Sequence, residues 1–374
     1  MSEIERVERL ALEMREQELD RLLVWAPVNL RYLTGFTGSN GLALIAGTGY
    51  REGPHVFITD FRYETQAAEQ VPDVFERLIA PVDLLETAAQ ALSEEAERRP
   101  ANAVRAELGF DDASLTFRQH ARLRELLPPR WKMRRAGGLV EELREVKDEQ
   151  ELARIRAAAQ LADEALREVL EHGLVGRTER DVAIDLELRM RNLGAQAPSF
   201  PSIVACGAHA ALPHAEPREE PIPRDALVTI DWGAMLDGYC SDCTRTYATG
   251  SPPQEAVEVY ELVLRAQEAA LAGVSAGAGT HVVDAIAREI IEQAGHGERF
   301  GHGVGHGVGM EVHEGPRVSH TAPELELRAG NVLTIEPGVY LPGRLGVRIE
   351  DLAVVTAEGH EVLTGLGKEL AVVG

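Results

Sequence analysis

The sequence has few cysteines, no long apolar run and no excess of basic residues. Three cysteines are too few for a disulfide scaffold in a chain of 374 residues. No apolar run approaches the roughly 20 residues of a membrane-spanning helix, and the charged N-terminus lacks the apolar core of a signal peptide. We therefore expect a cytoplasmic location without a membrane partner. The net charge of -23 argues against a nucleic-acid partner, because phosphate binding depends on lysine and arginine.

Two of the cysteines, Cys240 and Cys243, form a C-x-x-C pair. Redox and thiolate-metal sites with this spacing need both sulfur atoms on one side of a turn or helix start. The surrounding residues 238–248 instead predict a strand, in which side chains three positions apart point to opposite faces. We interpret both cysteines as core residues.

The chain is long enough for two domains, each with its own core. In its first third, short apolar runs alternate with helical patterns, which predicts an α/β layer structure. The strands are expected at 22–25, 41–45, 55–58 and 103–106, and the helices at 3–19, 84–98 and 114–126. No cluster of carboxylates and histidines occurs here, so we expect this domain to support the site or to restrict its substrates.

A domain boundary is predicted near residue 144, giving domains of 1–143 and 144–374. Asp148 and Glu151 have the form of a capping box before a long helical pattern. The helices of the second domain are expected at 152–172, 181–193 and 282–293, and its strands at 202–205, 227–232, 239–247, 310–313, 332–335 and 346–355. Helices grouped apart from hairpin-linked strands indicate an α+β domain.

Two segments of this second domain repeat one pattern: strand, carboxylate, glycine turn, returning strand, carboxylate. The first is T-I-D-W-G followed by S-D-C-T-R-T, with Asp231 and Asp242. The second is T-I-E-P-G followed by V-R-I-E-D, with Glu336 and Glu350. The repeat predicts one hairpin used twice, and therefore internal pseudo-symmetry. Four converging carboxylates would repel one another without cations among them, so the pattern predicts a metal site, with two metals expected.

A glycine-rich run, G-H-G-V-G-H-G-V-G at 301–309, lies between the two repeats. Each glycine costs a helix about 1 kcal/mol relative to alanine, which excludes a helical pair of zinc-binding histidines. An extended path would place His302 and His306 on one side and let another backbone approach the other side closely. We predict His306 as a metal ligand, whereas supporting and substrate-contact roles both stay open for His302 and His313.

Three further polar residues near these motifs need an interpretation. Alternation along a strand places Arg348 on the same face as Glu350, where it could hold a carboxylate ionised or bind a substrate group. From the sequence alone, His214 is an ordinary loop residue. His209 is interpreted as structural or exposed.

With these motifs, the sequence resembles the pita-bread metallopeptidases over its whole length, specifically the M24B branch of prolidases and Xaa-Pro aminopeptidases. The family segments G-H-G-x-G-H, V-H-E-x-P and V-R-I-E-D are intact. The resemblance implies an α+β protein with a creatinase-like α/β N-terminal domain, a pita-bread catalytic domain with pseudo-two-fold symmetry, and a homodimer. The metal ligands that it implies are Asp231, Asp242, His306, Glu336 and Glu350.

The resemblance also implies roles for the residues around the metals. His214 and His313 would contact the scissile peptide, and His302 and Arg348 would lie around the residue after it. Glu336 would relay a proton, His313 would stabilise the oxyanion, and His214 would lie near the departing proline nitrogen. Two divalent ions would activate the attacking water. The hard, oxygen-rich ligands favour Mn2+ over Co2+, Fe2+ or Zn2+.

The implied function is hydrolysis of the bond between an N-terminal residue and a following proline. Segments 29–41 and 59–63 resemble small bacterial Xaa-Pro aminopeptidases more than dipeptidases, so an Xaa-Pro aminopeptidase is expected. An Xaa-Pro dipeptidase is the alternative, and it would need a cationic clamp just beyond proline, such as Arg348 or an N-domain arginine. A creatinase-like amidinohydrolase and a non-enzymatic metal-binding scaffold are further alternatives, which the complete ligand set disfavours.

Overall fold

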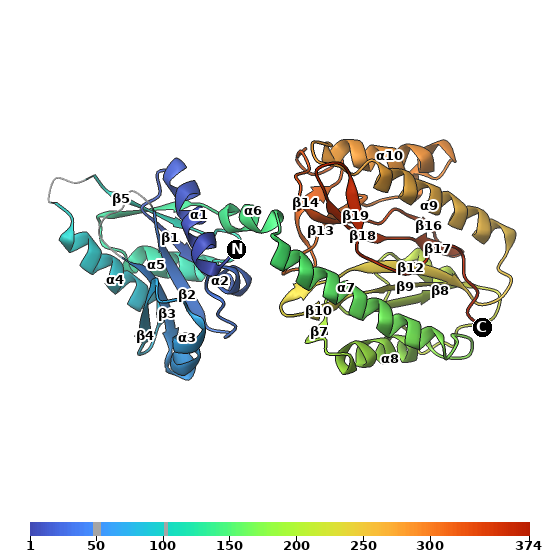
Figure 1. Cartoon of the computed structure of the whole chain (residues 1–374), viewed down its shortest axis with the longest axis horizontal. Coiled ribbons are helices and arrows are strands. Elements are labelled where there is room, and N and C mark those ends of the chain that lie inside the picture. Colours follow the sequence, from blue (N-terminus) through green and yellow to red (C-terminus); the bar gives the residue numbers. More distant parts are fainter. Residues whose placement is uncertain (48–53, 101–103) are drawn as a thin grey trace. The chain divides into compact units, whose positions relative to one another are not determined.

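The computed structural model describes residues 1–47, 54–100 and 104–374. These residues form two compact units, Met1–Arg144 and Glu145–Gly374, and each unit buries its own apolar core (Figure 1). None of the described helices combines the length and the apolar composition that a membrane-spanning helix requires.

The first unit is a mixed sheet accompanied by helices. Its strands are β1 (Arg21–Val24), β2 (Gly41–Ala46), β3 (His55–Asp60), β4 (Phe75–Ala80), β5 (Ala106–Phe110) and β6 (Trp131–Arg135). Its helices are α1 (Glu3–Glu16), α2 (Pro27–Thr34), α3 (Glu64–Gln70), α4 (Leu84–Arg98), α5 (Phe117–Leu126) and α6 (Leu139–Glu145). The strand order is β4-β3-β2-β1-β5-β6, with β2 antiparallel to both of its neighbours and the other pairs parallel.

The α/β structure predicted for this unit is confirmed, although the sequence does not predict β4, β6, α2, α3 or α6. The strand expected at 103–106 begins only at Ala106, and Ala103 lies outside the described residues. Helix α2 is not predicted, although it starts with Pro27 and ends at Gly35, which has φ of 71°. Proline in the first turn and a left-handed glycine at the end are the signals that mark such a short helix.

The second unit sandwiches its strands between two pairs of helices. The helices are α7 (Glu149–Leu170), α8 (Glu179–Asn192), α9 (Gln254–Ala272) and α10 (Thr280–Gln293). The strands are β7 (Ala197–Pro198), β8 (Ile203–Cys206), β9 (Leu227–Trp232), β10 (Ala234–Leu236), β11 (Tyr239–Cys240), β12 (Cys243–Ala248), β13 (Gly305–Gly307), β14 (Glu314–Val318), β15 (Val332–Ile335), β16 (Gly338–Leu341), β17 (Leu345–Arg348), β18 (Asp351–Val355) and β19 (His360–Val362). The α7–α8 pair and the α9–α10 pair lie on opposite sides of these strands (Figure 1).

The two sequence repeats adopt the same strand arrangement. In the first, β9 pairs antiparallel with β12, and β10 and β11 form a smaller hairpin between them. In the second, β15 pairs antiparallel with β18, and β16 and β17 form the smaller hairpin. Asp231, Asp242, Glu336 and Glu350 lie at or beside the points where the chain passes between the outer pair and the inner hairpin. This placement puts the two carboxylates of each repeat close together.

Several details differ from the expected hairpins. The strands predicted at 239–247 and 346–355 each break beside the carboxylate, because the chain changes there from the inner hairpin to the outer pair. The strand predicted at 310–313 is wrong: these residues bend to connect β13 to its antiparallel partner β14. Because the strand predicted at 239–247 breaks, Cys240 and Cys243 do not lie on one strand, so strand alternation does not apply to them. Both cysteines are nevertheless free and buried, as a core role requires.

Helix α9 is not predicted, although its sequence carries a helical period. Val259, Val263, Ala266 and Ala270 recur at spacings of three and four and are all buried. The helix begins after Pro253 without a side-chain cap, so no start signal precedes the pattern. The capping box expected at the start of α7 is confirmed, because Asp148 and Glu151 form it, and Thr178 with Asp181 forms a second one at the start of α8.

The glycines of 301–309 allow close contact between neighbouring strands. A Cβ atom on Gly305 would overlap the carbonyl oxygen of Thr334, and one on Gly307 would overlap that of Gly315. At Gly301, by contrast, a Cβ atom would meet no atom within 4 Å.

Replacing Gly305 by alanine is expected to lower the free energy of unfolding by about 3 kcal/mol, because the new methyl group overlaps backbone that cannot move alone. The matched change Gly301→Ala should stay within about 0.5 kcal/mol of the wild type. Urea denaturation of both metal-free variants checks this, and equal effects of the two changes would contradict it.

Candidate metal centre

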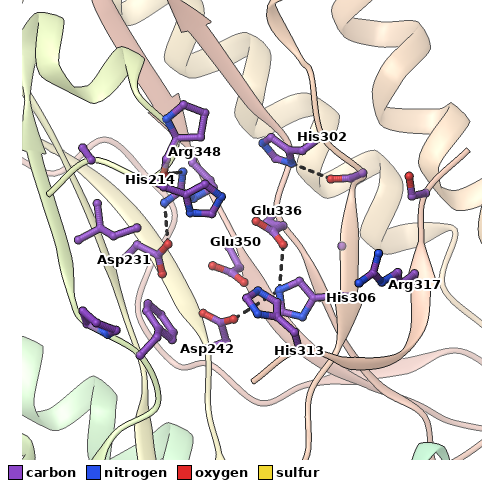
Figure 2. Close-up of a pocket in the computed structure, with 18 of the residues that line it drawn as sticks. His214, Asp231, Asp242, His302, His306, His313, Arg317, Glu336, Arg348 and Glu350 are labelled. Carbon is purple, nitrogen blue, oxygen red and sulfur yellow. Dashed lines mark hydrogen bonds and ion pairs between the residues drawn. The ribbon is translucent and has the colours of Figure 1, made fainter. Parts of the chain in front are cut away.

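The second unit contains a cavity of about 580 Å³ that both repeats line. Four carboxylates and one imidazole of the predicted centre face this cavity: Asp231, Asp242, His306, Glu336 and Glu350. Figure 2 shows these side chains directed toward one another from separate strands and loops. Residues more than 100 positions apart in the chain thus meet at one place.

Three of the carboxylates have the spacing of a shared cation site. One oxygen each of Asp231, Asp242 and Glu350 lies within 4.8 Å of the others. Asp231 Oδ1 and Glu350 Oε1 are buried and have no hydrogen-bond partner among the described residues. A buried carboxylate oxygen without a donor is costly, and a hard cation satisfies it. The cluster therefore fits a metal site.

Burial raises the pKa of Asp242 and of Glu350 well above their usual values, and the charges of the neighbouring carboxylates add to this effect. Burial also raises the pKa of Asp231, although the charge of Arg348 opposes it. These carboxyl groups therefore resist ionisation together unless positive charge is added to the cavity.

Glu336 is the exception, because His306 lies against it. Burial alone would raise the pKa of Glu336, but the hydrogen bond and charge of His306 are the main factors that lower it to about 2. His306 Nε2 is 3.2 Å from Glu336 Oε1 and 3.6 Å from Asp242 Oδ2. Thr334 fixes this pair, since its hydroxyl accepts from His306 N and donates to Glu336 Oε1, both at 3.1 Å.

Arg348 contacts a different carboxylate from the one expected. Its Nη2 donates to Asp231 Oδ2 at 2.6 Å, and its Nε donates to the Thr244 hydroxyl at 3.0 Å. Thr244 in turn donates to Glu350 Oε2 at 2.7 Å. The pairing with Glu350 is therefore indirect. Arg348 Nη1 donates to Tyr340 Oη at 3.0 Å, and the arginine is buried, so its guanidinium is engaged within the protein.

Tyr340 is a cavity residue that the sequence patterns do not reveal. It lies on β16, directly after the carboxylate and glycine turn of the second repeat. His302 Nε2 is 2.9 Å from Tyr340 Oη, and His302 Nδ1 is 2.7 Å from Gly303 O. Both nitrogens of His302 are thus engaged, which orients its ring at the cavity wall.

His313 and His214 are more open to the cavity. The His313 ring meets that of His306 edge to face, with centroids 4.3 Å apart. Burial and the charge of His306 lower the pKa of His313, which favours the neutral imidazole. His214 faces the cavity from the segment after β8, beside Arg348 (Figure 2).

Arg317 is a second cavity residue absent from the sequence predictions. It lies on β14, is exposed, and lines the cavity (Figure 2). Its charge adds to the lowering of the His313 pKa, so the two groups are near each other. Within the described residues it forms no ion pair with a carboxylate. Nothing local marks this arginine, because the pairing of β13 with β14 brings it to the cavity.

Two family models match the chain in succession. The Creatinase/Prolidase N-terminal domain matches residues 6–146, and metallopeptidase family M24 matches residues 153–357. The chain belongs to metallopeptidase family M24.

Relatives within family M24 match nearly the whole chain. An Xaa-Pro dipeptidase of Pyrococcus furiosus is 34% identical over 368 residues, which cover 98% of this chain and 99% of the relative. The solved structure of an Xaa-Pro dipeptidase from Bacillus anthracis has a TM-score of 0.92 at 37% identity and covers 99% of this chain and 100% of its own. The X-Pro aminopeptidase from Thermotoga maritima MSB8 has a TM-score of 0.86 at 33% identity and covers 98% and 100%.

These matches confirm the predicted M24B pita-bread family and the fold class, a creatinase-like N-terminal domain followed by the catalytic domain. The similar proteins include both Xaa-Pro dipeptidases and X-Pro aminopeptidases. The chain is therefore an M24B metallopeptidase, and the substrate that it cleaves needs a separate argument.

Proposed function

We propose that this protein is a metal-dependent exopeptidase that hydrolyses the bond between an N-terminal residue and a following proline. The observation that carries the proposal is the crowding of four carboxylates and His306 in one cavity, where two buried carboxylate oxygens have no donor among the described residues. Two divalent ions would be held by Asp231, Asp242, His306, Glu336 and Glu350. Mn2+ is the expected metal, because oxygen ligands are hard; Co2+, Fe2+ and Zn2+ are alternatives.

When bound, divalent cations supply the Lewis acidity that lowers the pKa of the attacking water and polarises the scissile carbonyl. Glu336, which its contact with His306 keeps ionised, would take the proton of the attacking water at a carboxylate oxygen and pass it to the departing proline nitrogen. His313 donates a ring N–H to the developing oxyanion, and His214 lies near the departing proline nitrogen. Arg348 holds Asp231 in place through their 2.6 Å hydrogen bond.

The shape and polarity of the cavity suit proline after the scissile bond. Phe200, Pro201 and Pro213 line it and offer apolar surface to a pyrrolidine ring. The Xaa-Pro amide has no N–H. A site that offers no hydrogen-bond acceptor to the scissile amide therefore loses no hydrogen bond when proline follows the scissile bond. By the family resemblance, His302, which Tyr340 orients, would contact the same residue.

Arg317 favours dipeptides as the preferred substrates. A dipeptide carries a free carboxylate on its proline, and an exposed guanidinium at the cavity can bind that group through charge-assisted hydrogen bonds. Arg348, which the sequence analysis names as a possible clamp beside an N-domain arginine, is already bonded to Asp231, Thr244 and Tyr340. The second candidate is an Xaa-Pro aminopeptidase, which the resemblance of segments 29–41 and 59–63 favours.

Ala-Pro is expected to be hydrolysed with a kcat/KM about tenfold above that of Ala-Pro-Ala when Mn2+ is present, since one charged hydrogen bond contributes about 1.5–3 kcal/mol. Arg317→Gln should remove this difference by raising KM for Ala-Pro, whereas Arg299→Gln, at an exposed arginine outside the cavity lining, should not. Equal or faster cleavage of Ala-Pro-Ala by the wild type would favour the aminopeptidase. Release of alanine from neither peptide would contradict the proposed function itself.

The homodimer and the cytoplasmic location that the sequence analysis predicts remain part of the proposal. Light scattering coupled to size-exclusion chromatography tests the dimer. The expected mass is twice the chain mass of 40.8 kDa.

A further inference from the structure

The segment that carries His214 is held at both ends by one buried carboxylate. Glu179 opens helix α8, and 1% of its side chain is exposed. Its Oε1 accepts a hydrogen bond from Cys206 N at 2.8 Å, at the start of segment 206–218. Its Oε2 accepts from Arg218 N at 3.0 Å, at the other end. The Arg218 guanidinium also donates to both oxygens at 3.2 Å.

A residue inside the segment contacts the same carboxylate. His209 Nδ1 lies 2.8 Å from Glu179 Oε2, so His209 has a structural role. Burial would raise the pKa of Glu179, but the hydrogen bonds from Arg218 and Cys206 outweigh it and lower the pKa. Glu179 is therefore an ionised group whose burial is offset by donors that all come from one segment.

The middle of segment 206–218 forms a wall of the cavity. Pro213, His214 and Ala215 line it, and Arg348 Nη1 donates to Pro213 O at 3.1 Å. The side chain of His214 forms no hydrogen bond with another described residue. Its position therefore depends on where the backbone of its own segment is held.

We propose that Glu179 is a positioning residue for Xaa-Pro cleavage, which sets the place of His214 by joining both ends of segment 206–218. The inference rests on the proposed function, in which His214 lies at the departing proline nitrogen. Glu179 is not among the residues that line the cavity and forms no hydrogen bond with the candidate ligands, so it acts through segment 206–218, which carries His214. Loss of this anchor would displace the imidazole, and a misplacement of 1 Å reduces turnover by about 10²-fold.

Glu179→Gln places an amide nitrogen against groups that donate hydrogen bonds, so it weakens the anchor while keeping the size of the side chain. We expect kcat on Ala-Pro to fall about 10- to 100-fold, with KM and the bound metal unchanged. Asp181→Asn is the matched control: Asp181 lies in the same first turn of α8 and is exposed, and among the described residues its side chain bonds only to Thr178. Its kcat should equal that of the wild type.

Combination with His214→Ala separates positioning from a general structural role. If Glu179 acts through His214, adding Glu179→Gln to His214→Ala causes no further loss of kcat. A full additional loss in the double variant would overturn the proposal. Arg218→Leu is a second variant at a side chain that is 40% exposed, and it should lower kcat in the same direction by a smaller factor.

Hydrogen exchange tests the anchor independently of catalysis. Peptides from 206–218 should exchange faster in Glu179→Gln than in the wild type, and equally in Asp181→Asn. Unchanged exchange of this segment would overturn the proposal whatever the enzyme hydrolyses. If the wild type leaves Xaa-Pro peptides intact, the proposed function fails, and the exchange result still decides whether Glu179 holds the segment.

Discussion

Asp242→Asn is expected to lower kcat/KM for Ala-Pro by at least about 10³-fold, because metal binding contributes several kcal/mol of transition-state stabilisation. Asp242 is 5% exposed, and one of its oxygens lies within 4.8 Å of oxygens of both Asp231 and Glu350. Asparagine keeps the shape of this side chain but removes its charge. The remaining cluster then attracts divalent cations less strongly.

The measurement combines kinetics with the metal content of the purified protein. Both kcat/KM and bound metal should fall in Asp242→Asn. Asp237→Asn is the control from the same repeat: Asp237 is exposed in the turn between β10 and β11 at φ of 49°, a conformation that asparagine adopts readily. It should change neither quantity. Full metal content and activity in Asp242→Asn would contradict the proposed centre.

Removal of the divalent ions with a chelator is expected to abolish hydrolysis and to destabilise the second unit. A ligand present at 1,000 times its Kd stabilises the folded state by about 4 kcal/mol, so the metal-free protein should lose stability of this order. Added Mn2+ should restore both activity and melting temperature. Activity that persists in chelator would instead favour a creatinase-like amidinohydrolase.

The destabilisation should depend on pH with a definite sign. In the metal-free protein, burial raises the pKa of Asp231, Asp242 and Glu350 above their unfolded values. The folded state then binds more protons than the unfolded state, so stability falls as pH rises from the unfolded pKa values near 4 toward the raised folded ones. Bound cations pair with the ionised carboxylates and remove this loss. The difference in melting temperature between loaded and metal-free protein should therefore grow between pH 5 and pH 8; a difference that shrinks would contradict it.

Much of the candidate centre could be predicted because its residues lie in recognisable short sequence motifs. Four carboxylates occupy equivalent positions in the two repeats: Asp231, Asp242, Glu336 and Glu350. A single carboxylate at a strand end carries little information, but the same pair of carboxylates in both repeats indicates a shared site. His306 could be predicted because it lies in a glycine-rich run between the two repeats, where the glycines exclude a helix. The roles of Tyr340 and Arg317 had no such signal, because each reaches the cavity only through strand pairing.

The sequence also does not reveal the roles of His214 in segment 206–218 and of Glu179, which holds that segment. His214 resembles an ordinary loop residue, and Glu179 resembles an acid in the first turn of a helix, where such residues are common. Only the packing of α8 against the end of β8 reveals that Glu179 binds both ends of this segment.

The sequence by itself determined the family, the α+β order of the two units, the repeated carboxylates and the non-helical histidine run, because each depends on local period, local charge or short motifs. The tertiary structure decided which of these groups meet. Arg348 bonds Asp231 directly and reaches Glu350 only through Thr244, because the chain breaks between β17 and β18 and the strands of the two repeats lie against one another. Contacts across more than 100 residues depend on how strands pair and stack, and no local period encodes that arrangement.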